Sequence, residues 1–499
     1  MTSPKNVLVI GAGFAGLSVA SFLAQKGWKV TVLEQHDMPG GRARKFEAAG
    51  FSFDMGPSWY WMPDVFEKYF EKFGKKVSDY YQLKRLDPSY RVYFEDTHWD
   101  MPANYDDLKQ LLESVEPGAA KALDQFMDEA KFKYDVGVGK LVHKPGQSLF
   151  EFMDWEVVTG VFKLDIFQSM KKHVARFFKH PYIKSIMEFP VLFLGALPGN
   201  TPALYSLMNY ADIKGGTWYP EFGMYSIVKA MYQVALDQGV QFKFNEEVKR
   251  INVVNGEAKS ALSYHRVTGA QVEYEFEVLV GAGDYHHIET KLLDTKYQSY
   301  SSAYWDSRLM APSSLLYYVG LNKKLPGALH HNLFFDTDFG VHGAEIYTHP
   351  TWPKDPLFYA SVPSVTDPTV APEGCENLFL LIPVAAGLSG DTEAIREEYF
   401  QKIIARMETR LGQTISDSIV YKKSFAVADF ISEYHSFKGN AYGLANTLLQ
   451  TAILKPSCKS KKVKNLYYTG QLTVPGPGVP PSLISGEVVA AFVHNNHKN

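Results

Sequence analysis

The sequence predicts an α/β fold in which a parallel sheet is assembled from separated stretches of the chain. An aliphatic run at 7–10 leads into a glycine-rich turn and a helical pattern, a second strand-like run lies within 277–288, and a strand followed by a helix lies at 465–493. Continuous aliphatic runs are typical of parallel strands buried on both faces. Because 499 residues are too many for one core, we expect at least two domains.

The first element is a βαβ unit with a dinucleotide-binding fingerprint. Gly11, Gly13 and Gly16 give the pattern G-x-G-x-x-G between a strand and a helix, and a second strand ends on Glu34. The first glycine permits a tight turn, the second lets the backbone approach a pyrophosphate, and the third allows close packing of helix on strand. We expect Glu34 to accept hydrogen bonds from a ribose diol.

The helix N-terminus adds to this binding surface. The helix begins at Phe14 and Ala15, where N–H groups without intrahelical partners and the positive end of the helix dipole favour a phosphate. A dinucleotide is therefore the expected ligand of the first unit.

Two turns follow the βαβ unit. Gly40 and Gly41 predict a tight turn that lets Arg42 place a fork of donors near a diphosphate or a ring carbonyl. The alternating residues 51–54 predict a short strand, which is broken by the sequence Gly-Pro-Ser at 56–58. An NAD-dependent dehydrogenase needs neither of these elements.

Two distant stretches complete the predicted nucleotide-binding domain. Residues 215–251 read as a turn, a helix that stops at Gly239 and a strand through Val248. Residues 465–493 read as a strand, Gly470, a Pro/Gly loop and a helix from about Pro480. We expect free N–H donors around the start of this last helix to stabilise negative charge on a bound ring.

These motifs together resemble the FAD-binding half of the amine oxidase and carotenoid desaturase superfamily. The amino-acid sequence of nearly the whole chain is similar to the sequences of bacterial phytoene desaturases, and the segments TWYPEFGMYS and GQLTVPGPGVPPSLISG are examples. The resemblance implies a Rossmann-like, glutathione-reductase-like FAD-binding domain built from discontinuous segments. It also implies an inserted α+β substrate domain and a helical, membrane-facing region.

The resemblance also implies domain limits and cofactor contacts. The backbone at Val248 would contact adenine, and the last strand and helix would close the FAD site. The expected segments are 1–85, 215–290 and 426–499 for FAD, and 86–214 and 291–425 for the substrate. The expected cofactor-binding residues are Gly11, Gly13, Phe14, Ala15, Gly16, Glu34, Gly40, Gly41, Arg42, Gly56, Pro57, Ser58, Val248, Gly470, Gly478, Val479 and Pro480.

The chain departs from its relatives at one point. Many of them read G-T-H-P-G-x-G-I-P-G in the last loop, whereas this chain has Gln471, Leu472, Thr473, Val474 and Pro481. No flavin-side role of a histidine can therefore be carried over, and the position of the new double bond is left open.

The implied reaction is the FAD-dependent desaturation of a long polyene. Hydride leaves an allylic carbon toward flavin N5, and loss of a proton from the neighbouring carbon installs a double bond. Since a hydrocarbon offers no hydrogen-bonding groups, an apolar tunnel must position it, and the aromatic and aliphatic residues of 150–210 and 300–385 are candidates for its lining.

Several functions remain open at this stage. Phytoene is the leading substrate, and a later-acting enzyme such as a 1-hydroxycarotenoid 3,4-desaturase is a close alternative. A flavin-dependent carotenoid isomerase, a polar-amine oxidase and a non-catalytic carotenoid carrier are more remote. Because no second complete βαβ fingerprint follows residue 34, the expected electron acceptor is a quinone or oxygen.

No catalytic residue is assigned from the sequence. Burial statistics make surface or capping roles the better interpretation of the available carboxylates, and structural roles the better one for two histidines near a strand end. The residues in question are Asp154, Asp284, Asp429, Glu433, His286 and His287. The two cysteines, Cys375 and Cys458, have no metal-binding spacing, so no metal and no disulfide is expected.

Composition and one basic stretch bear on location. The formal net charge of −3 gives no general attraction to nucleic acid, and no leader or spanning segment is evident, so we expect a cytoplasmic protein. Residues 149–180 interleave aromatic with basic side chains and predict peripheral contact with a membrane, from which the carotenoid is delivered. A helix with one core-facing side explains the same pattern equally well. The relevant side chains are Trp155, Phe162, Phe167, Phe177, Phe178, Lys163, Lys171, Lys172, Arg176 and Lys179.

Overall fold

The computed structural model describes residues 5–148, 151 and 164–497. Its centre is a five-stranded parallel sheet with strand order β19-β13-β1-β2-β9. The strands are β1 (Asn6–Ile10), β2 (Lys29–Leu33), β9 (Gln241–Lys243), β13 (Val278–Gly281) and β19 (Leu466–Tyr468). The predicted parallel sheet from separated stretches is thereby confirmed.

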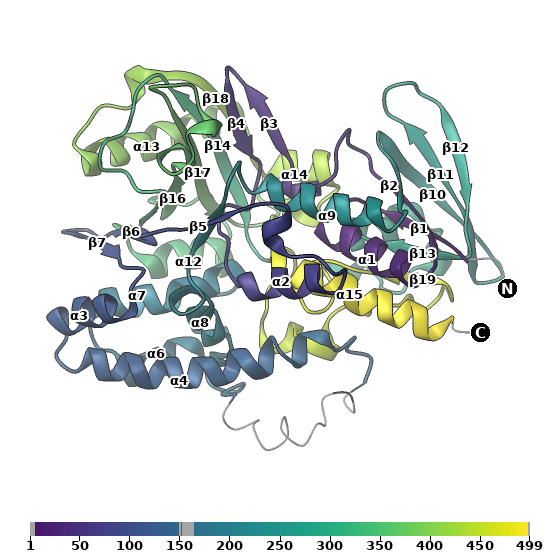
Figure 1. Cartoon of the computed structure of the whole chain (residues 1–499), viewed down its shortest axis with the longest axis horizontal. Coiled ribbons are helices and arrows are strands. Elements are labelled where there is room, and N and C mark those ends of the chain that lie inside the picture. The colour runs from purple at the N-terminus through teal and green to yellow at the C-terminus, as the bar shows by residue number, and fades with distance from the viewer. Residues whose placement is uncertain (1–4, 149–150, 152–163, 498–499) are drawn as a thin grey trace.

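Three helices pack beside this sheet. They are α1 (Phe14–Gln25), α9 (Tyr225–Asp237) and α15 (Val479–Asn496), and α1 contacts both of the others. Figure 1 shows α1 beside α15, so the two ends of the chain lie together. A Cβ atom on Gly486 would lie 2.5 Å from Cβ of Ser18, so the absence of a side chain on Gly486 lets α15 approach α1 closely.

A three-stranded antiparallel sheet extends from the edge of this region. It comprises β10 (Glu246–Val254), β11 (Glu257–His265) and β12 (Gln271–Glu275). The prediction of one strand running through Val248 was wrong, because the chain leaves the parallel sheet after β9. Asn245 has φ of 60°, a left-handed conformation that interrupts the strand and directs β10 into the second sheet.

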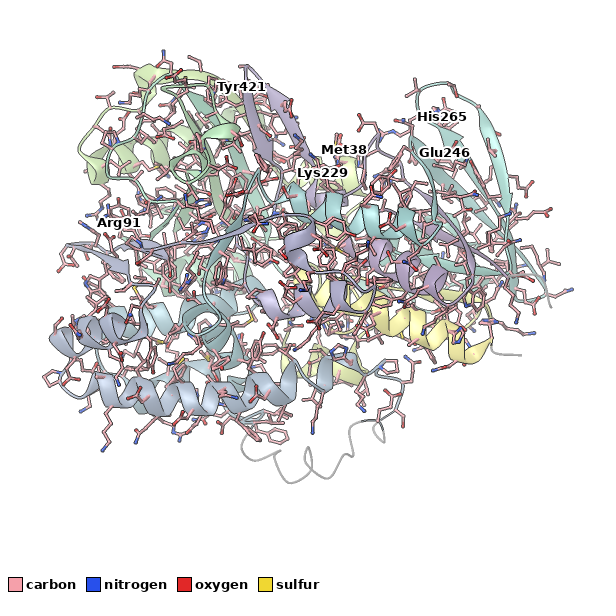
Figure 2. The ribbon with its side chains drawn as sticks, viewed as in Figure 1. Met38, Arg91, Lys229, Glu246, His265 and Tyr421 are labelled. Carbon is pink, nitrogen blue, oxygen red and sulfur yellow. The ribbon has the colours of Figure 1, made fainter. Side chains whose placement is uncertain are left out.

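A seven-stranded sheet with order β18-β14-β17-β16-β15-β6-β7 forms the other half of the molecule. Its strands are β6 (Tyr90–Tyr93), β7 (His98–Met101), β14 (Ser313–Leu321), β15 (His331–Phe334), β16 (Phe358–Ser361), β17 (Glu376–Val384) and β18 (Ile419–Phe425). Figure 2 shows Arg91 of β6 and Tyr421 of β18 on this half, away from Glu246 and His265, which pair across β10 and β11.

The two faces of this sheet have different partners. Leu315 and Tyr317 of β14 belong to a core that includes α13 (Glu393–Leu411), whereas Leu316 and Tyr318 belong to the central core of the molecule. Successive side chains of a strand point to opposite faces, so the even-numbered residues of β14 face inward.

Further helices and two small hairpins surround these sheets. The helices are α2 (Pro63–Glu71), α3 (Tyr105–Val115), α4 (Ala119–Gly137), α6 (Met170–Phe177), α7 (Pro181–Glu188), α8 (Leu207–Ile213), α10 (Tyr285–His287), α11 (Ser302–Asp306), α12 (Phe339–Tyr347) and α14 (Val427–Tyr434). The hairpins pair β3 (Lys45–Ala48) with β4 (Phe51–Asp54), and β5 (Leu83–Arg85) with β8 (Trp218–Pro220).

The strand origins follow the expected division of the chain. The parallel sheet takes its strands from 1–85, 215–290 and 426–499, and the seven-stranded sheet from 86–214 and 291–425. The limits of the domains themselves stay a prediction.

Candidate active site

One continuous cavity of about 510 Å³ joins the two halves of the molecule. At one end it is lined by backbone of the glycine-rich turn and by Glu34, and at the other by apolar side chains such as Leu197 and Phe335. All the expected cofactor-binding residues except Gly16 line this cavity.

The glycine fingerprint has the geometry that its pattern predicts. Gly11 has φ of 102°, which a residue with a side chain rarely adopts. A Cβ on Gly16 would lie 2.0 Å from the carbonyl oxygen of Gly11, so Gly16 serves the packing of α1 and does not face the cavity. A Cβ on Gly13 would meet no atom within 4 Å, so space is open beside its backbone.

Glu34 is buried at the end of β2, and both of its carboxylate oxygens already accept hydrogen bonds. Oε2 accepts from the backbone N–H of Ala12 at 2.7 Å and Oε1 from that of His36 at 3.0 Å. Burial raises the pKa of Glu34, although these N–H groups oppose the shift. A carboxylate has about four lone-pair positions, so the cavity side retains acceptor capacity for a diol.

Arg42 is held by residues from the far end of the chain. Its Nη2 donates to Ser436 Oγ at 2.8 Å and to Asn440 O at 3.3 Å, while its buried Nε has no hydrogen-bond partner among the described residues. Burial lowers the pKa of Arg42. A buried, unpaired donor on a cavity-lining guanidinium fits a site that receives a phosphate or a ring carbonyl.

The turn after β4 is fixed by a contact that the sequence did not reveal. Asp54 accepts hydrogen bonds from the backbone N–H groups of Met224 at 2.7 Å and Tyr225 at 3.0 Å, at the start of α9. A Cβ on Gly56 would lie 2.6 Å from the carbonyl oxygen of Arg42, so the two turns touch through backbone. This contact brings Pro57 into the cavity wall next to Arg42.

The start of α15 faces the same cavity, but it offers fewer donors than expected. Pro480 and Pro481 have no N–H, and Ser482 N–H bonds to Gly478 O. The expectation of free donors throughout 478–482 is therefore corrected: the N–H groups of Gly478 and Val479 are the donors that this turn presents.

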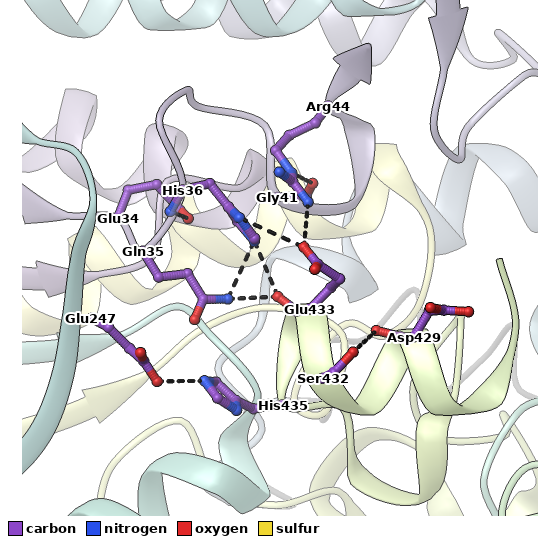
Figure 3. A network of polar contacts seen from close by, with 10 residues as sticks. All are labelled: Glu34, Gln35, His36, Gly41, Arg44, Glu247, Asp429, Ser432, Glu433 and His435. Carbon is purple, nitrogen blue, oxygen red and sulfur yellow. Dashed lines mark hydrogen bonds and ion pairs between the residues drawn. The ribbon is translucent and has the colours of Figure 1, made fainter. Parts of the chain in front are cut away.

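Side-chain contacts tie α14 to the nucleotide-binding turns (Figure 3). Glu433 Oε2 lies 3.3 Å from Arg44 Nη2, and the carbonyl oxygen of Glu433 accepts from Gln35 Nε2 at 2.6 Å. His435 Nε2 lies 3.2 Å from Glu247 Oε1, next to Val248 in the cavity wall. Segments far apart in the sequence are thus joined around the expected adenosine end.

The titratable groups considered from the sequence have structural partners. Asp284 accepts from the backbone N–H groups of His287 at 3.0 Å and Phe437 at 3.1 Å, and Asp429 lies 2.8 Å from Arg396 Nη2. Asp284 has the capping role that burial statistics favoured, and Asp429 caps α14 through the N–H of Ala426 and also pairs with Arg396. Asp154 lies outside the described residues.

His286 and His287 each pack against another ring. The His287 ring is parallel to that of His435 at 4.0 Å, and the His286 ring lies 3.9 Å from that of Phe437. Burial lowers the pKa of His286 to about 4 and that of His287 to about 3, so both are neutral at pH 7. His287 lines the cavity, yet its geometry identifies no reacting partner.

The apolar half of the cavity draws on both stretches that the sequence pointed to. Residues from 150–210 and from 300–385 meet here, on the inner face of the seven-stranded sheet and on α12. They include Phe189, Leu192, Leu197, Met208, Leu316, Leu333, Phe335, Phe339, Ile346 and Leu381.

The 149–180 stretch differs from the expected surface. Residues 149–150 and 152–163 are outside the described part, including Trp155, Phe162 and Lys163. Phe178 is only 1% exposed and packs against Phe126, so its expected place on a membrane-facing surface was wrong. Phe167 is 85% exposed. Within 5–148 and 164–497, no helix combines the length and hydropathy that crossing a bilayer requires.

One cluster has the composition of a metal site. The ligand atoms of Glu129, Asp165 and His173 lie within 4.8 Å of one another. However, Lys133 Nζ lies 2.9 Å from Asp165 Oδ2 and 3.3 Å from His173 Nε2, where it supplies the positive charge itself. We interpret this cluster as a buried salt-bridge network and assign no metal to it.

The comparisons with known proteins agree with this site. Residues 14–494 match the family of flavin containing amine oxidoreductases. The chain is 41% identical over 490 residues to a carotenoid 3,4-desaturase of Haloarcula japonica, with 98% of each chain covered. It is 31% identical over 494 residues to a zeta-carotene-forming phytoene desaturase of Myxococcus xanthus, covering 98% of this chain and 93% of that one.

A solved structure shares the fold. An oxidoreductase from Methanosarcina mazei superimposes with a TM-score of 0.62 over 97% of this chain and 100% of that one, at 14% identity. The chain belongs to the flavin containing amine oxidoreductase family and, within it, to the carotenoid desaturases, and is an FAD-dependent oxidoreductase acting on CH–CH bonds.

Proposed function

We propose that the chain binds FAD along the cavity and desaturates a carotenoid in its apolar half. The continuity of the cavity carries the proposal, because one space connects the glycine fingerprint to a hydrocarbon-lined chamber. Open space beside Gly13 and the unpaired Nε of Arg42 fit the cofactor at its diphosphate and ring portions.

Each part of the FAD has a proposed group of residues. The fingerprint residues with Glu34 and Val248 hold the adenosine and diphosphate, and the turns at 40–42, 56–58 and 478–480 with Gly470 surround the isoalloxazine ring. Gly16 supports the fingerprint through backbone packing alone. When bound, FAD supplies a hydride acceptor at flavin N5.

The apolar wall positions the substrate by shape. Side chains such as Leu316 and Phe335 exclude water and hold an allylic carbon of the polyene near the ring. Departure of hydride from this carbon leaves a delocalised cation, and loss of a proton from the adjacent carbon forms the double bond. We assign no residue to accept this proton.

Two relatives bear on which carotenoid is used. The family resemblance favoured phytoene, but the relative with 41% identity is a carotenoid 3,4-desaturase, whereas the phytoene desaturase is 31% identical. We therefore place a later-acting 3,4-desaturation, for instance of a 1-hydroxycarotenoid, ahead of phytoene desaturation.

The apolar substrate and the single dinucleotide fingerprint support proposals on where the protein works and which electron acceptor it uses. The carotenoid is taken from lipid by peripheral contact of a cytoplasmic protein, and the reduced cofactor is reoxidised by a quinone or oxygen. We expect no stoichiometric NAD(P) site, because residue 34 is followed by no second complete fingerprint.

Pigment analysis tests the function directly. Cells that supply phytoene, and separately cells that supply 1-hydroxylated carotenes, are compared with and without this chain. The expected result is a product with one more double bond in the cells that supply hydroxylated carotenes. In parallel, anaerobic protein is mixed with each polyene and its flavin absorbance is followed.

The outcomes separate the alternatives. Conversion of phytoene alone would restore the earlier-acting assignment. Binding of polyene without bleaching of the flavin would favour a carotenoid carrier. A requirement for added NAD(P)+ with quinone and oxygen excluded would contradict the proposed acceptor.

A further inference from the structure

One buried serine hydroxyl in the substrate half of the cavity makes no well-formed hydrogen bond within the described part of the chain. Ser314 of β14 is 1% exposed and lines the cavity. Its Oγ lies beside the Tyr442 hydroxyl but makes no hydrogen bond of standard geometry to a described residue. The preceding Ser313 points to the other face of the strand, where its Oγ donates to the carbonyl oxygen of Gly439. The two neighbouring serines therefore differ in what their hydroxyls meet.

Two tyrosines bring further hydroxyls to this part of the cavity. Tyr442 lines the cavity next to Ser314, and burial raises its pKa in spite of the opposing effect of the Ser314 hydroxyl. Tyr347 of α12 also lines the cavity, and burial together with the nearby Tyr442 raises its pKa. A polar patch of Ser314, Tyr442 and Tyr347 thus interrupts an otherwise largely apolar wall.

The polar patch lies toward the proposed ring of the cofactor. Tyr442 is separated by one residue from Asn440, whose carbonyl oxygen accepts from Arg42 Nη2. Asn440 Oδ1 accepts from Gln471 Nε2 at 3.3 Å, and Gln471 lines the cavity beside Gly470. Asn440 and Gln471 thus connect the patch to Arg42 and Gly470, two of the residues proposed to surround the isoalloxazine.

An unpaired hydroxyl at this position discriminates between substrates. A pure hydrocarbon offers it no acceptor or donor, so the buried hydroxyl stays unsatisfied when such a substrate displaces water. A substrate that carries an oxygen at the same depth pairs with it. Sites built to hydrogen-bond a substrate hydroxyl reject analogues that lack it more strongly than apolar sites reject an added one.

We propose that Ser314 and Tyr442, flanked by Tyr347, are specificity-determining residues that hydrogen-bond a hydroxyl group on the polyene close to the bond that is oxidised. This inference rests on the proposed function and names the chemical group of the substrate that the cavity recognises. A 1-hydroxylated end group of the polyene fits this proposal. C1 is two bonds from C3, so a polyene whose C3–C4 bond lies next to the isoalloxazine ring has its hydroxyl group close to the polar patch.

The test compares two polyenes that differ only in this group. FAD-loaded parent, Ser314→Ala, Tyr442→Phe and the control Ser313→Ala are each given a 1-hydroxycarotenoid and its 1-deoxy analogue of equal chain length and conjugation. We measure kcat/KM for both polyenes and the equilibrium Kd of each from polyene absorbance under anaerobic conditions.

The expected result is a change in preference, not a general loss. The ratio of kcat/KM for the hydroxylated over the deoxy polyene falls roughly 10- to 100-fold in Ser314→Ala, and in the same direction in Tyr442→Phe. The control Ser313→Ala keeps the parent ratio, although it loses a buried hydrogen bond. The ratio of Kd values changes in parallel.

Other outcomes contradict the inference in recognisable ways. A parent enzyme that treats both polyenes alike, or a ratio that stays unchanged in both cavity variants, overturns it, and the latter result means that water satisfies the Ser314 hydroxyl. If the parent oxidises neither polyene, the proposed function fails. The Kd ratios still decide the inference in that case, because preferential binding of the hydroxylated polyene that Ser314→Ala abolishes supports it.

Discussion

A Cβ atom on Gly16 would lie 2.0 Å from the carbonyl oxygen of Gly11, so α1 and the turn before it meet through backbone alone. No side-chain motion can relieve such an overlap. We predict that Gly16→Ala lowers the free energy of unfolding by about 2 kcal/mol or more, measured by urea denaturation. Gly199→Ala is the control, because a Cβ there meets nothing within 4 Å. Equal stability of Gly16→Ala and the parent would show that the turn can move.

Gly13 gives the opposite expectation, because the space beside it is open. Its φ of −74° is accessible to any residue, so Gly13→Val should fold. The added methyl groups would occupy the place of the pyrophosphate, and we predict purified protein with less than about a tenth of the parent flavin content. Flavin absorbance relative to protein measures this. Gly199→Val should keep the parent content, and retention of flavin by Gly13→Val would mean that the diphosphate lies elsewhere.

Asp212 is predicted to make stability depend on pH. It is buried, and accepts from the hydroxyls of Tyr90 at 2.8 Å and Thr217 at 3.0 Å. Burial raises its pKa to about 6. Between the unfolded value of about 4 and this folded value, the folded protein binds more protons than the unfolded chain, so stability falls as pH rises.

The variant Asp212→Asn removes this dependence, because the amide stays uncharged. Its stability relative to the parent should increase by about 2 kcal/mol between pH 4 and pH 7, with almost no further change above pH 7. Urea denaturation at several pH values measures the difference. The exposed Asp417 supplies the control Asp417→Asn, which should follow the parent. If the free energies of unfolding of Asp212→Asn and the parent change with pH in the same way, the pKa of Asp212 is not raised by folding.

The surface of α6 is predicted to contribute to membrane contact. Lys171 and Lys172 are exposed there, and Phe167 just before the helix is exposed as well. Each basic residue near an anionic leaflet contributes roughly 1 kcal/mol, which salt weakens. Replacing both lysines by Glu should lower binding to anionic liposomes at least tenfold at low salt, measured by sedimentation, while bound FAD is retained.

The choice of these residues avoids the buried network behind them. Arg176 is left unchanged because its Nη2 lies 3.8 Å from Glu129 of that network. Lys26→Glu with Lys243→Glu is the control, a charge change of the same size on the nucleotide-binding half. If the α6 variant sediments as the parent does at every salt concentration, another surface makes the contact.

Most of the residues that line the glycine-rich end of the cavity could be predicted from local sequence. The positions of Gly11, Gly13, Arg42, Gly56 and the start of α15 in one cavity follow from turns whose geometry is set by neighbouring residues. Glycine and proline restrict or release the backbone locally, so their effect can be read without knowing the rest of the fold.

Other features depended on which distant segments meet. Asp54 holds the start of α9, and Phe178 packs into the core. Ser313 donates a hydrogen bond to Gly439, whereas Ser314 faces the cavity and makes no well-formed hydrogen bond to any residue that the structure describes. The sequence alone could not distinguish these two serines, because successive side chains of a strand point to opposite faces and the sequence does not show which face borders the cavity.

The sequence by itself therefore determined the parallel sheet, the family and the cofactor. The reason is that short motifs specify the backbone conformation of the turns, and a dinucleotide binds mainly to backbone groups in those turns. Only the tertiary structure decided the chamber for the substrate and the partners of its polar groups. Burial and hydrogen bonding of a side chain are set by segments more than a hundred residues away, as with β14 and the chain around Tyr442, and no local pattern encodes their meeting.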